Sequence, residues 1–185
     1  GGGDTQTASP WCWDLAEVEH HHLADNLVDL VLANFRKLPA ETQQLLQLAA
    51  CVGNDFSLDR LKSLTQDSLT GLVQELLPAI EAGFVLVDTR RQREGQVNLY
   101  RFAHDRLQEA AYISMDSNRR IDTHWQIGQI LLAELAHGGS QSTYFEIADH
   151  LNLGLPRIDK PSDRLQVNRC NILAARQARS AAAYP

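Results

Sequence analysis

One histidine and one aspartate, His104 and Asp105, are the residues of this chain that we single out for possible chemistry. They follow an alternating stretch, 97–102, and open a helical pattern that runs to Tyr112. A histidine can change its charge near neutral pH, and it can bind polar ligands. An acid in the first turn of a helix is also favoured by the helix dipole, so spacing alone leaves an ordinary structural role open for both residues.

Other groupings that could support catalysis or metal binding are poorly formed. Glu17, Glu19 and the three histidines 20–22 are of metal-ligand types, but consecutive helical residues point in different directions and cannot converge on one ion. The sequence contains no G-x-x-x-x-G-K-[ST] phosphate loop and no G-x-S-x-G nucleophile turn. We therefore predict that this chain is not an enzyme and holds neither a metal nor a cofactor of its own.

The charge balance argues against nucleic acids and membranes as partners. Among 185 residues, 17 Lys and Arg stand against 23 Asp and Glu, which gives a net charge of −6. Such a chain repels phosphate backbones and anionic lipid surfaces. Cys12, Cys51 and Cys170 form no C-x-x-C motif, and no apolar run approaches the roughly 20 residues of a membrane helix. We expect a cytoplasmic protein with reduced thiols.

The pattern along the chain predicts a mainly α fold with three parts. Residues 1–24 form a linker in which Trp11 and Trp13 dock, 25–112 form a winged-helix domain with a preceding helix, and 113–185 form a helical arm. The chain starts without Met and stops directly after an Ala-rich helical pattern, so we expect a piece of a longer protein.

The winged-helix prediction depends on the order of elements within 25–112. A helix over 25–38 precedes a second helix that stops at Gly53, then a short helix from Ser57 and a longer one capped by Asp67 or Ser68. The stretches 85–87 and 97–102 follow as a two-stranded hairpin. A helix-turn-helix core with a β wing has this order.

The arm is predicted to contain stacked helical hairpins of the tetratricopeptide-like type. Helical patterns cover 121–135, 144–151 and 165–183, with a loop over 154–162. Small residues in the last helix, such as Ala174 and Ala178, permit close helix crossing. The arm is therefore expected to receive a protein partner.

A winged helix also raises the possibility of DNA binding. The candidate recognition helix, 68–82, contains no Lys or Arg and carries Glu75 and Glu81. Base and phosphate contacts require basic side chains, which here gather only at 90–93 in the wing. DNA binding stays an alternative that the charges disfavour.

Several stretches together resemble the segment after the ATPase core in large bacterial, notably cyanobacterial, multi-domain serine/threonine and histidine sensor kinases. They are WCWDL at 11–15, DNLVDL at 25–30, LPAETQQLLQLAACVG at 38–53, YRFAHDRLQEAAY at 100–112, IADHLN at 147–152 and AARQARSA at 174–181. Those proteins belong to the AAA-type signal-transduction ATPases with numerous domains (the STAND class). The resemblance implies that ATP or ADP binds to an upstream domain of the parent protein.

In that class a His-Asp pair at the end of the winged helix lies against the nucleotide, and His104 and Asp105 stand where the pair is expected. An imidazole can donate to a β-phosphate oxygen. The resemblance thus implies a non-catalytic regulatory segment of a two-component or kinase signalling protein, with the upstream nucleotide-binding and kinase domains as partners. The alternatives are a DNA-binding winged-helix arm of a transcriptional regulator and a helical-repeat interaction scaffold.

Overall fold

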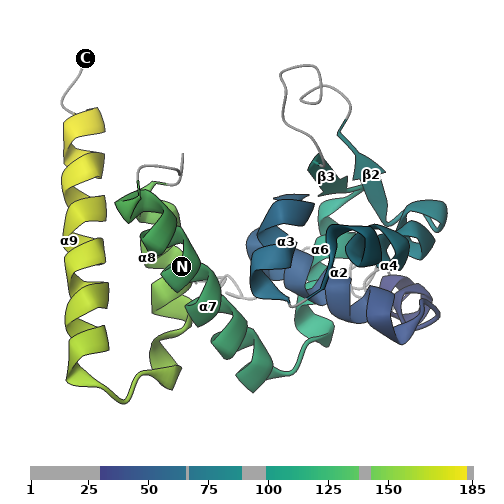
Figure 1. Ribbon diagram of the computed structural model, residues 1–185, viewed down its shortest axis with the longest axis horizontal. Helices are drawn as coiled ribbons and strands as arrows, with labels where there is room; N and C mark the ends of the chain where they lie inside the picture. Colours follow the sequence, from purple (N-terminus) through teal and green to yellow (C-terminus); the bar gives the residue numbers. More distant parts are fainter. Residues whose placement is uncertain (1–29, 66, 89–98, 138–142, 183–185) are drawn as a thin grey trace, which may run out of the picture.

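The computed structural model describes residues 30–65, 67–88, 99–137 and 143–182, which form a mainly helical structure with a small three-stranded sheet (Figure 1). Residues 30–35 are helical, as part of the helix predicted over 25–38. The predicted linker 1–24 and the residues between the hairpin strands lie outside the described residues. No described helix has the length and apolar character needed to cross a membrane.

Local capping signals set the ends of the first helices. Helix α2 (Ala40–Val52) starts after Pro39 and ends at Gly53, whose φ of 147° lies in the left-handed region that favours glycine. The Ser57 hydroxyl accepts from the Arg60 N–H at the start of α3 (Leu58–Leu64). The Ser68 hydroxyl accepts from the Gly71 N–H at the start of α4 (Leu69–Glu81). The predicted cap at 67 or 68 is therefore Ser68.

The sheet has one strand more than the predicted hairpin. Strands β2 (Val85–Val87) and β3 (Leu99–Phe102) pair antiparallel, as the alternating pattern predicts. A third strand, β1 (Asp55–Ser57), pairs antiparallel with the other edge of β3, so the order is β1-β3-β2. The Phe56 ring stacks on that of its partner Tyr100, with centroids 6.0 Å apart. This contact between distant parts of the chain stabilises β1, which has three residues and is too short to show an alternating pattern in the sequence.

The first hydrophobic core lies between these helices and the sheet. Its largest fully buried side chains come from the helical residues 30–35, from α2 to α4 and from β2 and β3: Phe35, Leu46, Leu58, Leu61, Leu72, Leu76, Val85 and Phe102. Helix α4 packs inward through Leu72, Leu76 and Ala79, whereas its apolar residues Val73 and Leu77 are exposed.

Four further α-helices follow β3 in the described part of the chain. They are α6 (Asp105–Ser114), α7 (Ser117–Ala136), α8 (Tyr144–Leu153) and α9 (Pro161–Ala182), with the short 3-10 turn Leu155–Arg157 before α9. Helix α7 starts four residues earlier than its apolar pattern because Asp116 caps it, its carboxylate accepting from two backbone N–H groups. Helix α9 starts at Pro161, within the predicted loop, because proline suits a first helical position.

Two glycines allow α7 to approach the chain around α8 closely. A Cβ at Gly128 would lie 2.6 Å from Cδ2 of Leu151, and one at Gly154 would lie 2.8 Å from Cα of Trp125. A second hydrophobic core forms here, mainly from the α7–α9 region, with Met115, Ile127, Leu131, Ile147, Leu151, Ile158, Val167, Cys170 and Ala174 among its buried members.

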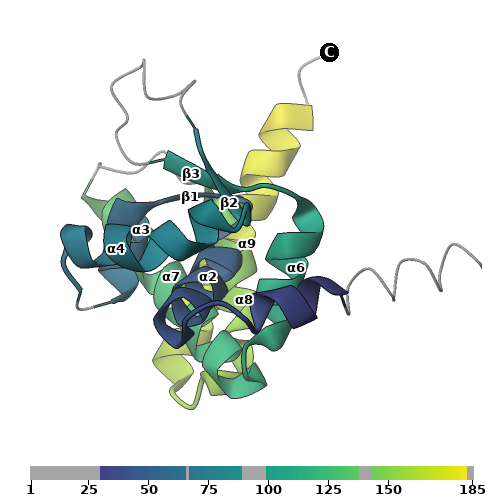
Figure 2. The same ribbon diagram turned by 90° about the vertical axis from the view of Figure 1, so that its right-hand side faces the viewer.

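The two cores meet where α2 and α3 face α7, and Figure 2 shows the same arrangement from the side. Arg60 of α3 forms an ion pair with Glu134 of α7, with 2.8 Å between Nη1 and Oε2. Cys51 at the end of α2 contacts the Met115 sulfur at 3.8 Å. The C-terminal helices are therefore held against the first core by side chains as well as by the chain itself.

Candidate functional site

The structure places His104 at the junction between β3 and α6, as the residue that caps α6. Its Nδ1 atom accepts from the Arg106 N–H at 3.1 Å, and its carbonyl oxygen accepts from the Leu107 N–H at 2.9 Å. Since a neutral imidazole has one N–H, acceptance at Nδ1 puts the proton on Nε2. The ring is exposed. His104 therefore has a structural role and also carries a second nitrogen that can act as a donor.

Asp105 is the first residue of α6 and is also exposed. Its position near the positive end of the helix dipole favours a carboxylate. The neighbouring Arg106 is directed to Glu109, with 2.6 Å between Nη1 and Oε2. The Ala103 N–H donates to the Phe84 carbonyl oxygen at 2.9 Å, which holds the start of α6 against the end of the α4–β2 connection. His104 and Asp105 thus lie together at one exposed helix start.

Metal binding finds no support within the part of the chain that the structure describes. Residues 17–22, weighed as metal ligands from the sequence, lie outside it. Among the described residues, no three His, Cys, Asp or Glu side chains gather closely enough to hold an ion.

A network of three polar side chains, two of them buried, links α6, α7 and α8, and sequence reasoning missed it. The Tyr112 hydroxyl lies 3.0 Å from Nε2 of His124, and Nδ1 of His124 lies 2.9 Å from Nδ1 of His150. The two histidines are only 4% and 8% exposed. The sequence does contain a signal for these contacts. His124 lies three residues after Ile121 and His150 three residues after Ile147, so each histidine is a polar residue within an apolar helical stripe.

The surroundings of these three side chains keep both imidazoles neutral. Burial lowers the pKa of His150 to about 4, with His124 and Arg60 adding to the effect. Burial also lowers the pKa of His124, and the guanidinium of Arg120 contributes. Arg120 lies over the Tyr112 ring at 4.8 Å and donates to the Tyr112 carbonyl oxygen at 3.1 Å. The arrangement joins three helices through side-chain contacts.

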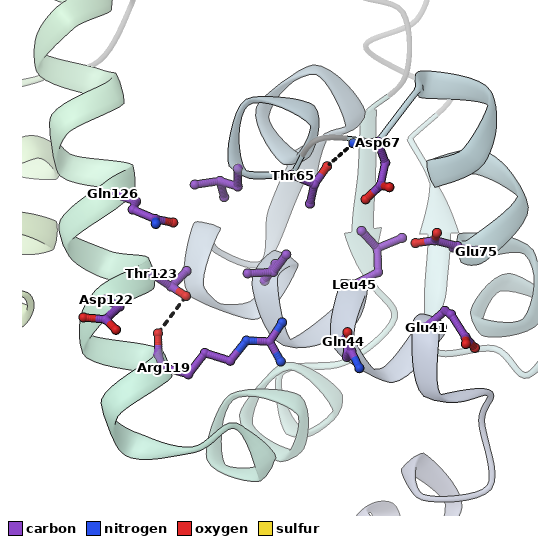
Figure 3. Close-up of a pocket in the computed structure, with 12 residues that line it drawn as sticks. Glu41, Gln44, Leu45, Thr65, Asp67, Glu75, Arg119, Asp122, Thr123 and Gln126 are labelled. Carbon is purple, nitrogen blue, oxygen red and sulfur yellow. Dashed lines mark hydrogen bonds between the residues drawn. The ribbon is translucent and has the colours of Figure 1, made fainter.

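A polar cleft of about 550 Å³ lies between α2, the α3–α4 turn and α7 (Figure 3). Its lining includes the carboxylates of Glu41, Asp67, Glu75 and Asp122 but only one guanidinium, that of Arg119. Burial raises the pKa of Glu75, and the charges of Asp67 and Glu41 add to the increase. An excess of negative charge makes this cleft unsuitable for a phosphate group.

Comparison with known proteins found a similarity to part of one signalling protein. The chain is similar to hybrid signal transduction histidine kinase G of Dictyostelium discoideum, with 24% identity over 225 aligned positions. The match covers 96% of this chain, which spans about 6% of the length of that kinase. No protein-family model matches the chain. No solved structure matches it either.

Proposed function

We propose that this chain is a non-catalytic regulatory segment of a signal-transduction protein, which couples the nucleotide state of a neighbouring ATPase core to a helical arm. Two findings support a signalling role: the similarity to part of a hybrid histidine kinase, and the ordered resemblance of 11–184 to the segment after a STAND-class ATPase core. We propose 25–112 as its winged-helix module and 113–185 as its arm.

The order of elements supports the winged-helix part of the proposal. The chain runs α2, β1, α3, α4, β2 and β3, with β2 and β3 as the hairpin and β1 completing the sheet. Helix α4, which would be the recognition helix, exposes Val73, Gln74 and Leu77 and contains no basic residue. These side chains favour contact with protein rather than with DNA.

The proposed nucleotide sensing depends on the position and hydrogen bonding of His104. Capping by Nδ1 orients the exposed ring and leaves the proton on Nε2, which can donate to a phosphate oxygen of a nucleotide bound by a neighbouring domain. Because the same ring caps α6, any shift of the imidazole changes the start of this helix. Asp105 is proposed as its companion at the same helix start.

Helix α6 also supplies a path from His104 to the arm. Near its other end Tyr112 meets His124 of α7, which meets His150 of α8. The contact between the two histidines is buried and that of Tyr112 is partly buried, and buried hydrogen bonds tolerate little misalignment. We propose that a displacement at the start of α6 is passed to α7 and α8 through these three side chains.

The test uses the full-length protein that contains this segment and follows the release of a fluorescent ADP analogue. His104→Ala removes both the cap and the imidazole, whereas His104→Ser keeps a capping hydroxyl but removes the donor. If His104 senses the nucleotide, both variants release ADP faster than the unaltered protein. If the residue only caps α6, His104→Ser releases ADP at the unaltered rate, and the sensor role is rejected.

Calorimetry on the chain alone tests whether it binds a nucleotide by itself. No heat of binding is expected when ADP is titrated, because a single imidazole cannot hold a nucleotide and the cleft near Arg119 is acidic. Micromolar affinity would make the chain a nucleotide-binding protein in its own right, contrary to the proposal.

A further inference from the structure

The outer face of α9 combines positive charge with exposed aliphatic side chains. Figure 1 shows α9 at the edge of the molecule, with α8 beside it on one side. Leu165 and Ile172, two helical turns apart, are 64% and 53% exposed. The residues that share this face are Arg164, Leu165, Asn168, Arg169, Ile172, Ala175, Arg176 and Arg179, all exposed. We refer to this set as the arginine face of α9.

No carboxylate of α9 accompanies the four arginines. The single acid of this helix, Asp163, lies outside the arginine face, between that face and the buried side formed by Val167, Cys170 and Ala174. Within the described residues, no ion pair includes any of these arginines. The arginine face is therefore a surface of uncompensated positive charge on a chain whose net charge is −6.

A groove borders the arginine face along the first half of α9. It has a volume of about 610 Å³ and lies where α9 meets the end of α7 and the start of α8. Leu132, Tyr144 and Leu173 line it together with Leu165 and Arg169 of the arginine face, and Asp163 is the one acid among its described lining residues. One large apolar side chain of a partner could enter this groove while carboxylates beside it meet the arginines.

We infer that the arginine face and its groove dock an acidic amphipathic helix of a partner protein, an inference that rests on the proposed role of the arm as the receiving element. Arginine is enriched at protein interfaces and pairs with carboxylates through two parallel hydrogen bonds. A membrane surface fits less well, since the face has only two large aliphatic side chains and the whole chain is negatively charged.

A displayed library of amphipathic helices tests the inference directly. Positions that flank the apolar stripe of each helix vary among Glu, Gln and Lys, and the full chain serves as the bait. We expect Glu to be enriched in the selected helices. The variant Arg169→Glu with Arg176→Glu should bind these helices about tenfold more weakly or worse, and should itself select Lys. Arg119→Glu, in the cleft on the far side of α7, should select Glu as the unaltered chain does.

Enrichment of Lys, or of none of the three residues, by the unaltered chain would overturn the inference. So would a Glu preference that survives the double charge reversal, because the helices would then bind elsewhere. Sedimentation with phosphatidylserine vesicles separates the lipid alternative: binding that the double variant loses, without Glu enrichment in the library, would assign the face to membranes. None of these results depends on His104, so failure here is distinct from failure of the nucleotide-sensing proposal.

Discussion

Nδ1 of His124 lies 2.9 Å from Nδ1 of His150, and this contact joins α7 to α8 inside the second core. Each neutral imidazole has one N–H, so one of the two rings donates and the other accepts. Protons on both Nδ1 atoms would face each other and remove the hydrogen bond. The packing of the arm should therefore depend on pH.

We expect the free energy of unfolding to decrease as the pH falls from about 6.5 to about 4. His150 has a pKa of about 4 in the folded chain because of burial, whereas an unperturbed histidine titrates at 6.5. In this window the unfolded chain binds a proton that the folded chain does not, so acid favours unfolding, by roughly 3 kcal/mol at full extent. Urea unfolding at a series of pH values measures the effect.

Carboxylates also contribute to acid unfolding, so the pH dependence of the unaltered chain must be compared with that of histidine variants. His150→Gln should weaken the dependence between pH 6.5 and 4, even if the variant is less stable throughout, while His124, whose pKa burial also lowers, still contributes. His137→Gln, which replaces an exposed histidine, should keep the dependence of the unaltered chain. An equal slope for His150→Gln and the unaltered chain would show that His150 is not buried in its neutral form.

Gly154→Ala should destabilise the chain by about 1–3 kcal/mol, because the added methyl group would overlap the backbone of Trp125 in α7. Gly71→Ala is the matched control: its new Cβ would meet only the Ser68 hydroxyl oxygen at 3.4 Å, and alanine suits a helix better. Thermal unfolding of both variants checks the prediction. A Gly154→Ala variant as stable as Gly71→Ala would contradict the close approach of α7 to this turn.

The ion pair between Arg60 and Glu134 should show a coupling energy of about 0.5–1 kcal/mol in a double-mutant cycle. Its side chains are 21% and 37% exposed, and it joins two helices that are distant in sequence. The pair formed by Arg106 and Glu109 lies within one helix turn and is more exposed, so its coupling should be smaller. A smaller value for Arg60 and Glu134 would argue against firm contact between α3 and α7.

The thiol of Cys51 should react slowly in the folded chain. Burial raises its pKa to about 12, in spite of Arg120 and Arg119 nearby, so almost no thiolate is present at pH 8. Burial also raises the pKa of Cys170. In a Cys12→Ser variant, a maleimide reagent should label neither thiol until urea unfolds the chain. Rapid labelling without urea would show that the second core opens readily.

Much of the helical structure could be predicted because its signals are local. Apolar residues at three- and four-residue spacing define α4, and Ser57 and Ser68 cap helices within three residues of themselves. The pairing of β2 with β3 confirms the hairpin predicted from the short apolar stretch 85–87 and the alternating stretch 97–102. None of these features requires information from a distant part of the chain.

The third strand and the buried histidines could not be predicted in the same way. Phe56 forms a strand because Tyr100, far along the chain, provides the hydrogen-bonding edge and the ring on which it stacks. His124 and His150 each look like a polar interruption of an apolar stripe, and only the crossing of α7 and α8 brings them together.

By itself the sequence determined that the chain is mainly helical, where most helices lie, and that His104 and Asp105 stand at a helix start. These properties depend on backbone preferences and on residues within a few positions of each other. Only the tertiary structure decided that β1 joins the sheet, which histidines pair, and which face of α9 stays exposed. Those outcomes depend on contacts and burial between distant segments, whose free energies arise only when the cores assemble.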